Sequence, residues 1–244
     1  RRIVVSGVEQ LSPRMRRVRF TGEDLSQVEW RGPAGHLKLI VPDDGQHEAP
    51  MPQPDGPRSP FTRTYTPRSI DPAERSLTID FVVHSHGPAG RWAARAAIGD
   101  RLVMMGPAPG YNIDGDASWL LLVGDETALP AIESILERLP ANTAAHALIE
   151  VAATDEQRSL PGNGKTRIEW LVRKDEASAG ARLEAAVVGD DRRHEPGRHA
   201  VSEPLHGRPT ALRVGDGLHD ARQQRFGADP LSLHDERRVA VQRA

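Results

Sequence analysis

The sequence of 244 residues contains no cysteine, only 4% aromatic residues and no long apolar run. Without cysteine the chain cannot form disulfides, bind an iron–sulfur cluster or zinc through thiolates, or use a catalytic thiol. Any redox chemistry would therefore depend on a bound cofactor. The longest apolar run, residues 119–123, is far shorter than the roughly 20 residues that span a bilayer. We expect no stable membrane insertion.

The chain also lacks an excess of charge of either sign. It has 32 Lys and Arg against 34 Asp and Glu, a net charge of −2, which gives no electrostatic reason to expect a nucleic-acid partner. The N-terminus has no apolar core of the kind found in secretory signals, so we expect a cytoplasmic protein. The length suits two domains of roughly 100–140 residues, and we expect a monomer.

The first half of the sequence has the pattern of short strands. These runs are rich in Val and Ile and are separated by Gly, Pro or Asp; they cover residues 3–8, 15–20, 37–41, 77–83 and 101–105. Such spacing, without a long helical pattern, predicts a small antiparallel barrel or sandwich. Residues 42–60 contain six prolines and are predicted to form a surface loop.

After residue 114 the pattern changes to that of an α/β domain. The apolar run 119–123 is typical of a strand buried on both faces of a parallel sheet. A helical pattern over 130–139 and strands at 145–151 and 168–172 follow. Strand, loop, helix, strand is the opening of a doubly wound domain. We therefore place the domain boundary near Gly115.

The segment 59–68, SPFTRTYTPR, concentrates residues suited to a phosphorylated aromatic ligand. An arginine fork suits phosphate, a tyrosine offers a flat face, and a threonine hydroxyl can reach a ring nitrogen. On a strand Arg63 and Tyr65 point to one side and Thr66 to the other. The alternative is an ordinary edge strand with an exposed arginine and a core tyrosine.

The segment 80–93, DFVVHSHGPAGRWA, leads from a strand through a Gly-Pro-Ala-Gly turn into a helical stretch. The free amides at such a helix start can bind an anion such as a pyrophosphate. The alternative is a plain helix N-terminus. We do not expect His84 and His86 to bind zinc or iron, because no third ligand stands at a suitable spacing.

The segment 124–132, GDETALPAI, follows the apolar strand. Ligands of open α/β sheets bind at the carboxyl ends of the strands, where this loop lies. The segment lacks the G-x-G-x-x-G fingerprint of a standard dinucleotide grip. It could also be a simple capped helix start, with Asp125 or Thr127 as the N-cap.

Three segments in this order, RTYTPR at 63–68, HGPAGRWA at 86–93 and GDETALPAI at 124–132, resemble the siderophore-interacting protein family. The segment SPRMRRVRFTG at 12–22 also resembles that family's first hairpin. These proteins are flavin-dependent ferric-siderophore reductases of the ferredoxin-reductase superfamily. The likeness covers about residues 1–174. It implies an N-terminal antiparallel β-barrel that binds FAD, residues 1–114, and an α/β domain for NAD(P)H, residues 115–244, with an atypical C-terminus.

The resemblance assigns roles to individual residues. Arg63 would contact the FAD phosphates, Tyr65 would pack on the flavin or ribityl chain, and Thr66 would lie near the flavin N5 edge. Around the isoalloxazine and the pyrophosphate turn it places Asp80, His84, Gly87, Ala89, Gly90, Trp92 and Ala93. The pocket for the nicotinamide would begin with Asp125, Glu126, Thr127 and Ala128.

The implied reaction is hydride transfer from NADPH or NADH to FAD, followed by electron delivery to the Fe(III) of a small-molecule siderophore. Fe(II) is softer than Fe(III), and hard oxygen ligands bind it less tightly. Candidates for a basic siderophore pocket are Arg68, Arg91, Lys165, Arg173 and Lys174. Candidates for contacts with a nucleotide 2′-phosphate are Thr154, Gln157, Arg158 and Lys165.

Residues 175–244 contain no Ile, Lys, Met, Trp or Tyr, and the family's closing segments are not recognisable there. This composition indicates a polar, partly disordered tail, or a stretch from about residue 176 that derives from a frameshift or a divergent terminus.

Two functional alternatives follow. One is a flavin oxidoreductase with another electron acceptor, and the other is an impaired or non-catalytic remnant that only binds FAD.

Overall fold

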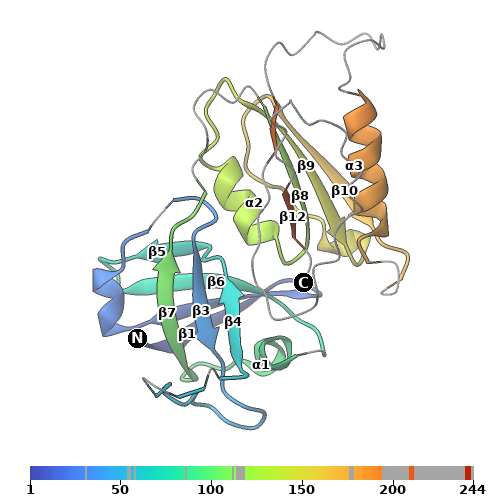
Figure 1. Cartoon of the computed structure of the whole chain (residues 1–244). Coiled ribbons are helices and arrows are strands. Elements are labelled where there is room, and N and C mark those ends of the chain that lie inside the picture. The colour runs from blue at the N-terminus through green and yellow to red at the C-terminus, as the bar shows by residue number, and fades with distance from the viewer. Residues whose placement is uncertain are drawn as a thin grey trace. The chain divides into compact units, whose positions relative to one another are not determined.

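The computed structural model consists of two compact units, which we describe separately (Figure 1). The structure describes residues 1–30, 32–53, 56–57, 59–85, 87–111, 113, 119–175, 179–193, 209–211 and 240–242. The first unit comprises Arg1–Asn112, Leu129–Arg138 and Ala153–Ser159. The second comprises Ile113–Ala128, Leu139–Ala152 and Leu160–Ala244. The proposed domain boundary near Gly115 lies outside the described residues, and so do His86 and most of the chain after 193.

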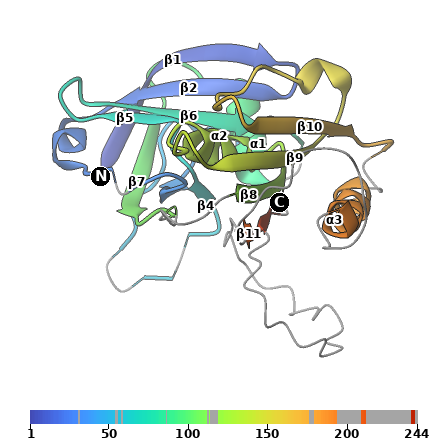
Figure 2. The same cartoon turned by 90° about the horizontal axis from the view of Figure 1, so that it is seen from above.

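The first unit is built on an antiparallel sheet, as the sequence predicts. Its strands are β1 (Arg2–Ser12), β2 (Met15–Thr21), β3 (His36–Ile40), β4 (Thr62–Tyr65), β5 (Ser69–Asp71), β6 (Ser76–Val82) and β7 (Arg101–Ala108). Their order is β4-β3-β7-β1-β2-β6-β5, and Figure 2 shows β1, β2 and β6 running side by side. The two end strands are not paired with each other among the described residues, so the sheet is barrel-like rather than closed.

The core of the first unit follows the two-residue period of its strands. Leu77, Ile79 and Phe81 of β6 are all fully buried, on the single face that their alternation predicts. Phe81 also packs against Phe20 and Trp92, with ring centroids 6.3 and 5.2 Å away. Phe20, Phe81 and Trp92 are fully buried, and aromatic rings bury large apolar areas.

The described residues of the first unit form four short helices: η1 (Glu23–Gln27), α1 (Pro88–Arg95), α2 (Leu129–Leu136) and η2 (Thr154–Glu156). The sequence places a helical stretch after the Gly-Pro-Ala-Gly turn, but α1 begins within that turn, with Pro88 at its start. Proline suits that position because its fixed φ is helical and it has no N–H to leave unpaired. The predicted helix 130–139 corresponds to α2, every residue of which is buried.

The second unit contains a parallel sheet, which confirms the predicted α/β class. Its main strands are β8 (Trp119–Asp125), β9 (Ala144–Val151) and β10 (Thr166–Val172), joined by the short β11 (Pro209–Ala211) and β12 (Ala240–Gln242). The order is β10-β9-β8-β11, and β12 also pairs with β8. All of these pairings are parallel, so the carboxyl ends of the strands share one edge.

A helix after residue 175 packs on this sheet, where the sequence predicts only a polar tail. Helix α3 (Ala181–Arg193) contacts β9 (Figure 1). Leu183 is buried against Leu121, Val123 and Leu148. A polar average composition hides this short apolar stripe, because a few residues at helical spacing suffice to cover a sheet. Strands β11 and β12 have three residues each, too few to show a period.

Candidate functional site

Strand β4 places Arg63 and Tyr65 on the inner side of the first unit. In the antiparallel pairing of β3 with β4, Leu39 is opposite Arg63 and Leu37 is opposite Tyr65. Residues directly opposite each other in such a pair share a face. Leu37 and Leu39 are buried in the core. The structure therefore confirms that Arg63 and Tyr65 share one side of the strand.

The guanidinium of Arg63 lies beside the turn that precedes α1. Its Nη1 donates to the carbonyl oxygens of Pro60 and Thr62, each at 2.8 Å. Its Nη2 would be 3.9 Å from a Cβ atom built on Gly87. The structure thus brings together two segments, 59–68 and 80–93, that the sequence could single out only one at a time.

The turn itself provides hydrogen-bond donors. Gly87 precedes α1 with φ 71°, a left-handed conformation that glycine adopts without strain. Among the described residues no side chain caps the helix start, and the first turn of α1 carries no acidic residue. The first-turn amides of Ala89 and Gly90 therefore contribute a partial positive charge that no carboxylate offsets. This arrangement, with Arg63 beside it, fits the diphosphate of a flavin dinucleotide.

His84 packs tightly on the start of α1. A Cβ atom on Gly90 would lie 2.6 Å from Cε1 and 2.7 Å from the carbonyl oxygen of His84. Only glycine allows this approach, because the second of those atoms is backbone and cannot rotate away. His84, Gly87 and Gly90 therefore lie in one small cluster, and the predicted position of His84 near the flavin ring stays a prediction.

The side chains of Trp92 and Ala93 attach α1 to the core and do not line the turn. Ala89, Trp92, Ala93 and Ala96 are all buried at helical spacing, so this face of α1 points into the core. The indole Nε1 of Trp92 donates to Oδ2 of the buried Asp100 at 3.2 Å. The side chain of Trp92 therefore positions the helix, and its predicted contact with the cofactor stays a prediction.

Tyr65 closes the aromatic cluster at the edge of the core. Its ring centroid lies 4.5 Å from that of Phe81. Burial raises the pKa of the Tyr65 phenol, and the charge of Arg63 lowers it by less, so Tyr65 is neutral at physiological pH. Thr66 is half-buried and precedes the buried Pro67. The predicted flavin contacts of Tyr65 and Thr66 stay predictions.

Asp80 faces away from this cluster. On β6 its side chain alternates with those of Ile79 and Phe81 and lies on the opposite face. Both carboxylate oxygens accept hydrogen bonds from Arg17, at 2.7 and 2.8 Å. The structure therefore places Asp80, a predicted cofactor residue, in an ion pair with Arg17.

In the second unit, Asp125 folds the loop after β8 into a turn. Its Oδ1 accepts hydrogen bonds from the amide of Thr127 at 2.9 Å and from the Thr127 hydroxyl at 2.6 Å. The amide of Ala128 donates to the Asp125 carbonyl oxygen at 3.0 Å. The predicted residues 125–128 thus form one turn at the carboxyl edge of the sheet, the edge at which α/β proteins bind ligands.

A buried cluster of charges lies at the same edge. Arg173 forms ion pairs with Glu126 and, at 3.6 Å, with Glu150. Glu150 also accepts the amide of Gly180 at 2.8 Å, close to the start of α3. Burial raises the pKa of Glu126, and the neighbouring Arg173 partly opposes that shift. Sequence reasoning missed this cluster, because its members are separated in the chain by more than 20 residues.

The basic residues predicted to bind a siderophore are mostly engaged elsewhere. Besides Arg173, Arg91 pairs with Asp44 at 2.9 Å, and Arg68 pairs with Glu133 and Glu137. Lys165 donates to a backbone carbonyl at 3.3 Å. It precedes β10 and so lies at the amino edge of the parallel sheet. Lys174 is exposed.

Two further classes of site can be examined in the part of the chain that the structure describes. Within it no three His, Asp or Glu side chains gather as a metal site would require. His86, one of the two histidines considered from the sequence, lies outside it. None of the described helices is both long and apolar enough to cross a bilayer.

Comparisons with known proteins identify first the fold and then the family. Phthalate dioxygenase reductase, a modular electron-transfer protein, is similar at 14% identity with a TM-score of 0.55, covering 86% of this chain and 59% of its own. That likeness establishes a ferredoxin-reductase-like fold. The siderophore utilization protein of T. fusca is similar at 35% identity with a TM-score of 0.69, covering 86% and 80%.

Family models match most of the sequence. The model of the siderophore-interacting FAD-binding domain matches residues 4–111, and that of the siderophore-interacting protein matches residues 117–201. The chain therefore belongs to the siderophore-interacting protein family, and its N-terminal part is the FAD-binding domain. The second match extends beyond residue 174, the limit of the likeness expected from the sequence.

Two named relatives are ferric reductases. The NADPH-dependent ferric-chelate reductase of Escherichia coli is 34% identical over 202 residues, covering 78% of each chain. The ferric vibriobactin reductase ViuB of Vibrio cholerae is 32% identical over 170 residues, covering 67% of this chain and 63% of its own. An uncharacterized protein of Mycobacterium tuberculosis is 36% identical, and the match spans 64% of its length.

Proposed function

We propose that this chain is an NAD(P)H-dependent flavin reductase that delivers electrons to ferric siderophores and so releases Fe(II). The observation that carries the proposal is the Arg63 guanidinium beside the uncapped start of α1. The family match and the two ferric-reductase relatives support the same reading.

The residues of the first unit bind and orient the cofactor. Bound FAD supplies the redox chemistry, since a flavin takes two electrons as hydride from a nicotinamide and passes them singly to Fe(III). Arg63 and the amides of Ala89 and Gly90 would hold its diphosphate. Tyr65, packed on Phe81, would present a rigid aromatic face to the ring system and exclude water from it.

The second unit would receive the nicotinamide nucleotide at the loop 125–128. No acid or base from the protein is required, because hydride and single electrons move without a protein-bound proton at the reacting atoms. The contribution of this loop is positioning, and a rigid turn such as that of Asp125 and Thr127 suits it. Comparing the rates of flavin reduction by NADH and by NADPH determines which nucleotide is preferred.

A second candidate is a flavin reductase with an acceptor other than an anionic chelate. The observation that favours it is the pairing of Arg68, Arg91 and Arg173 with carboxylates, which reduces the net positive charge available to a ferric siderophore. This reductase would still be reduced by a nicotinamide. It differs from a non-catalytic FAD-binding remnant, which would bind flavin without rapid reduction.

An anaerobic stopped-flow experiment on the full chain separates these functions. Reconstituted protein is mixed with NADH or NADPH while the flavin absorbance is followed, and then with a ferric siderophore and a chromogenic Fe(II) chelator. Rapid bleaching, recovery with the siderophore and an Fe(II) signal are expected. Bleaching without recovery would indicate another acceptor, and absence of bleaching would indicate the remnant.

A further inference from the structure

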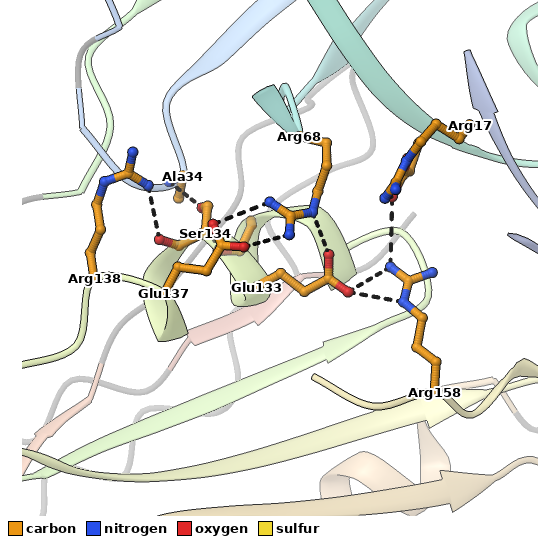
Figure 3. A network of polar contacts seen from close by, with 10 residues as sticks. Arg17, Ala34, Arg68, Glu133, Ser134, Glu137, Arg138 and Arg158 are labelled. Carbon is orange, nitrogen blue, oxygen red and sulfur yellow. Dashed lines mark hydrogen bonds and ion pairs between the residues drawn. The ribbon is translucent and has the colours of Figure 1, made fainter. Parts of the chain in front are cut away.

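Six charged side chains of the first unit alternate in sign along one continuous chain of contacts; Figure 3 labels all of them except Asp80. We call them the ion chain; in order they are Arg17, Asp80, Arg158, Glu133, Arg68 and Glu137. Successive members are 2.7 Å apart for the first pair, then 3.7, 2.8 and 3.0 Å. Arg68 Nη1 donates to Glu137 Oε2 at 3.1 Å. Three arginines and three carboxylates balance in charge.

The carboxylates at the centre of the ion chain are buried. The side chains of Asp80 and Glu133 are 0% and 5% exposed. A carboxylate removed from water in this way is strongly destabilising unless it stays paired. Glu133 is paired from two sides, by Arg68 and Arg158. Two segments that are distant in sequence therefore fix the position of the Glu133 side chain, and with it the position of α2.

Further hydrogen bonds fix the same elements. The amide of Ala34 donates to Oγ of Ser134, the neighbour of Glu133, at 2.7 Å. On the other side, Glu156 of η2 accepts the amide of Arg14 at 2.8 Å, which holds the segment that carries Arg158. Helix α2 and the segment 153–159 are thus attached to the rest of the first unit by polar contacts.

The ion chain joins helix α2 to the segment that follows Thr66, both within the first unit. Arg68 follows Thr66 by two residues, and its amide donates to the Thr78 carbonyl oxygen at 2.8 Å. Thr66 is the residue predicted to lie at the flavin N5 edge. Glu133 lies on α2, which begins at Leu129, directly after Ala128 at the end of the predicted nicotinamide loop.

We propose that Arg68 and Glu133 are positioning residues for hydride transfer, which set the start of α2 against the segment at the flavin edge. This inference rests on the proposed function. It replaces the expectation that Arg68 binds the siderophore. Arg158 acquires the same supporting role, so its removal is expected to slow NADH and NADPH equally instead of changing the preference between them.

The test compares the two half-reactions in Arg68→Gln, Glu133→Gln and the double variant. Flavin reduction by NADH is expected to slow about 10- to 100-fold, because displacements near 1 Å have such effects on near-attack geometry. FAD affinity is expected to stay within about twofold, and reoxidation of dithionite-reduced protein by a ferric siderophore to stay unchanged. The double variant is expected to be no slower than the worse single variant.

Two further variants make the result specific. Arg19→Gln removes a pair with Glu9 at 2.8 Å whose side chains are about half exposed; it lies on β2, close to Arg17, and should leave both half-reactions unchanged. Arg68→Lys, which retains the charge but not the fork, should recover part of the lost rate. If a variant at Glu133 does not fold, Glu137→Gln removes the outer partner of Arg68 and should slow flavin reduction in the same direction.

Two results would overturn the proposal while leaving the function intact. One is normal flavin reduction in Arg68→Gln with a raised KM for the ferric siderophore, which would make Arg68 a substrate contact. The other is a change in the ratio of NADPH to NADH rates in Arg158→Gln, which would make Arg158 a 2′-phosphate ligand. If instead the unmodified protein were not reduced by either nucleotide, the proposed function itself would fail.

Discussion

The two units offer opposite charge environments to a nucleotide. In the first, the start of α1 carries no carboxylate and Arg63 lies beside it. In the second, the loop after β8 contains Asp125 and Glu126, and its buried Arg173 is already paired. The charges around the start of α1 therefore suit a diphosphate. The loop 125–128 of the second unit has much less to offer an anion, although sequence patterns alone would treat the segments 80–93 and 124–132 as equivalent helix starts.

Replacing Arg63 by Gln should have the largest effect. It removes a charged donor beside Gly87, and charge-assisted hydrogen bonds of this kind contribute about 1.5–3 kcal/mol, so FAD should bind about 10- to 100-fold more weakly. Titration of the apoprotein with FAD, followed by flavin fluorescence, measures this. The same change at Arg173 should leave FAD affinity unaltered, and an equal loss there would break the distinction between the units.

A methyl group added at Gly90 should have the next largest effect. In Gly90→Ala the new Cβ would meet the ring and the backbone oxygen of His84 at 2.6–2.7 Å, which should destabilise the first unit by about 1–3 kcal/mol and weaken FAD binding. Urea unfolding without FAD measures the loss of stability. The increase in the free energy of unfolding when FAD is added measures the change in FAD binding. Gly164→Ala in the second unit is the matched control, because a methyl group at that position would have no described atom within 4 Å.

Because of Glu126, the free energy of unfolding of the second unit should decrease as pH rises. Burial raises its pKa above the ordinary 4.5, so the folded protein binds this proton more tightly than the unfolded chain does. The contribution is fully present below pH 4.5 and is lost as pH rises through the raised pKa. In Glu126→Gln this loss of stability with rising pH should disappear.

Unfolding of the second unit as a function of pH measures this effect, with Trp119 and Trp170 of that unit as reporters. Glu184→Gln, at an exposed position of α3, is the matched control for the loss of one carboxylate. A profile in Glu126→Gln that is parallel to that of the unmodified protein would contradict the assignment.

The smallest effect is expected at Arg91. Its pair with Asp44 is about half exposed on both sides, and such surface pairs contribute about 0–1 kcal/mol. Arg91→Gln should therefore change neither stability nor the KM for a ferric siderophore measurably. A clearly raised KM would indicate that Arg91 contacts the siderophore and that its pair with Asp44 does not prevent this contact.

Local sequence patterns predicted the elements of both units well where periods were long enough. The alternation Leu77, Ile79, Phe81 and the apolar run 119–123 correspond to β6 and β8. The three-residue β5 and the helix α3 were missed. A strand of three residues shows no period, and the apolar face of α3 consists of a few residues within a polar stretch.

Motif reasoning located the turn of Gly87 and the strand of Arg63, because each depends on neighbouring residues only. It could not predict which arginines are available to bind a ligand. Arg68 and Arg173 are neutralised by Glu133 and Glu126, which are tens of residues away in sequence. Pairing of this kind depends on the completed fold, so charge in a motif is a weak guide to a binding pocket.

The composition after residue 175 was also a weak guide, since the family match continues to residue 201 and Leu183 is buried against the sheet. The hypothesis of a frameshift or divergent terminus stays a prediction. It can be tested by translating the alternative frames of the gene beyond codon 175. Absence of the family's closing segments from every frame would remove the frameshift explanation.

The most direct test of the account is the stoichiometry of FAD bound to the full chain. Apoprotein would be titrated with FAD by equilibrium fluorescence, with Arg63→Gln in parallel. The account predicts one FAD per chain, bound tightly by the unmodified protein and clearly more weakly by the variant. A protein that cannot be reconstituted with FAD, or one whose affinity is independent of Arg63, would contradict it.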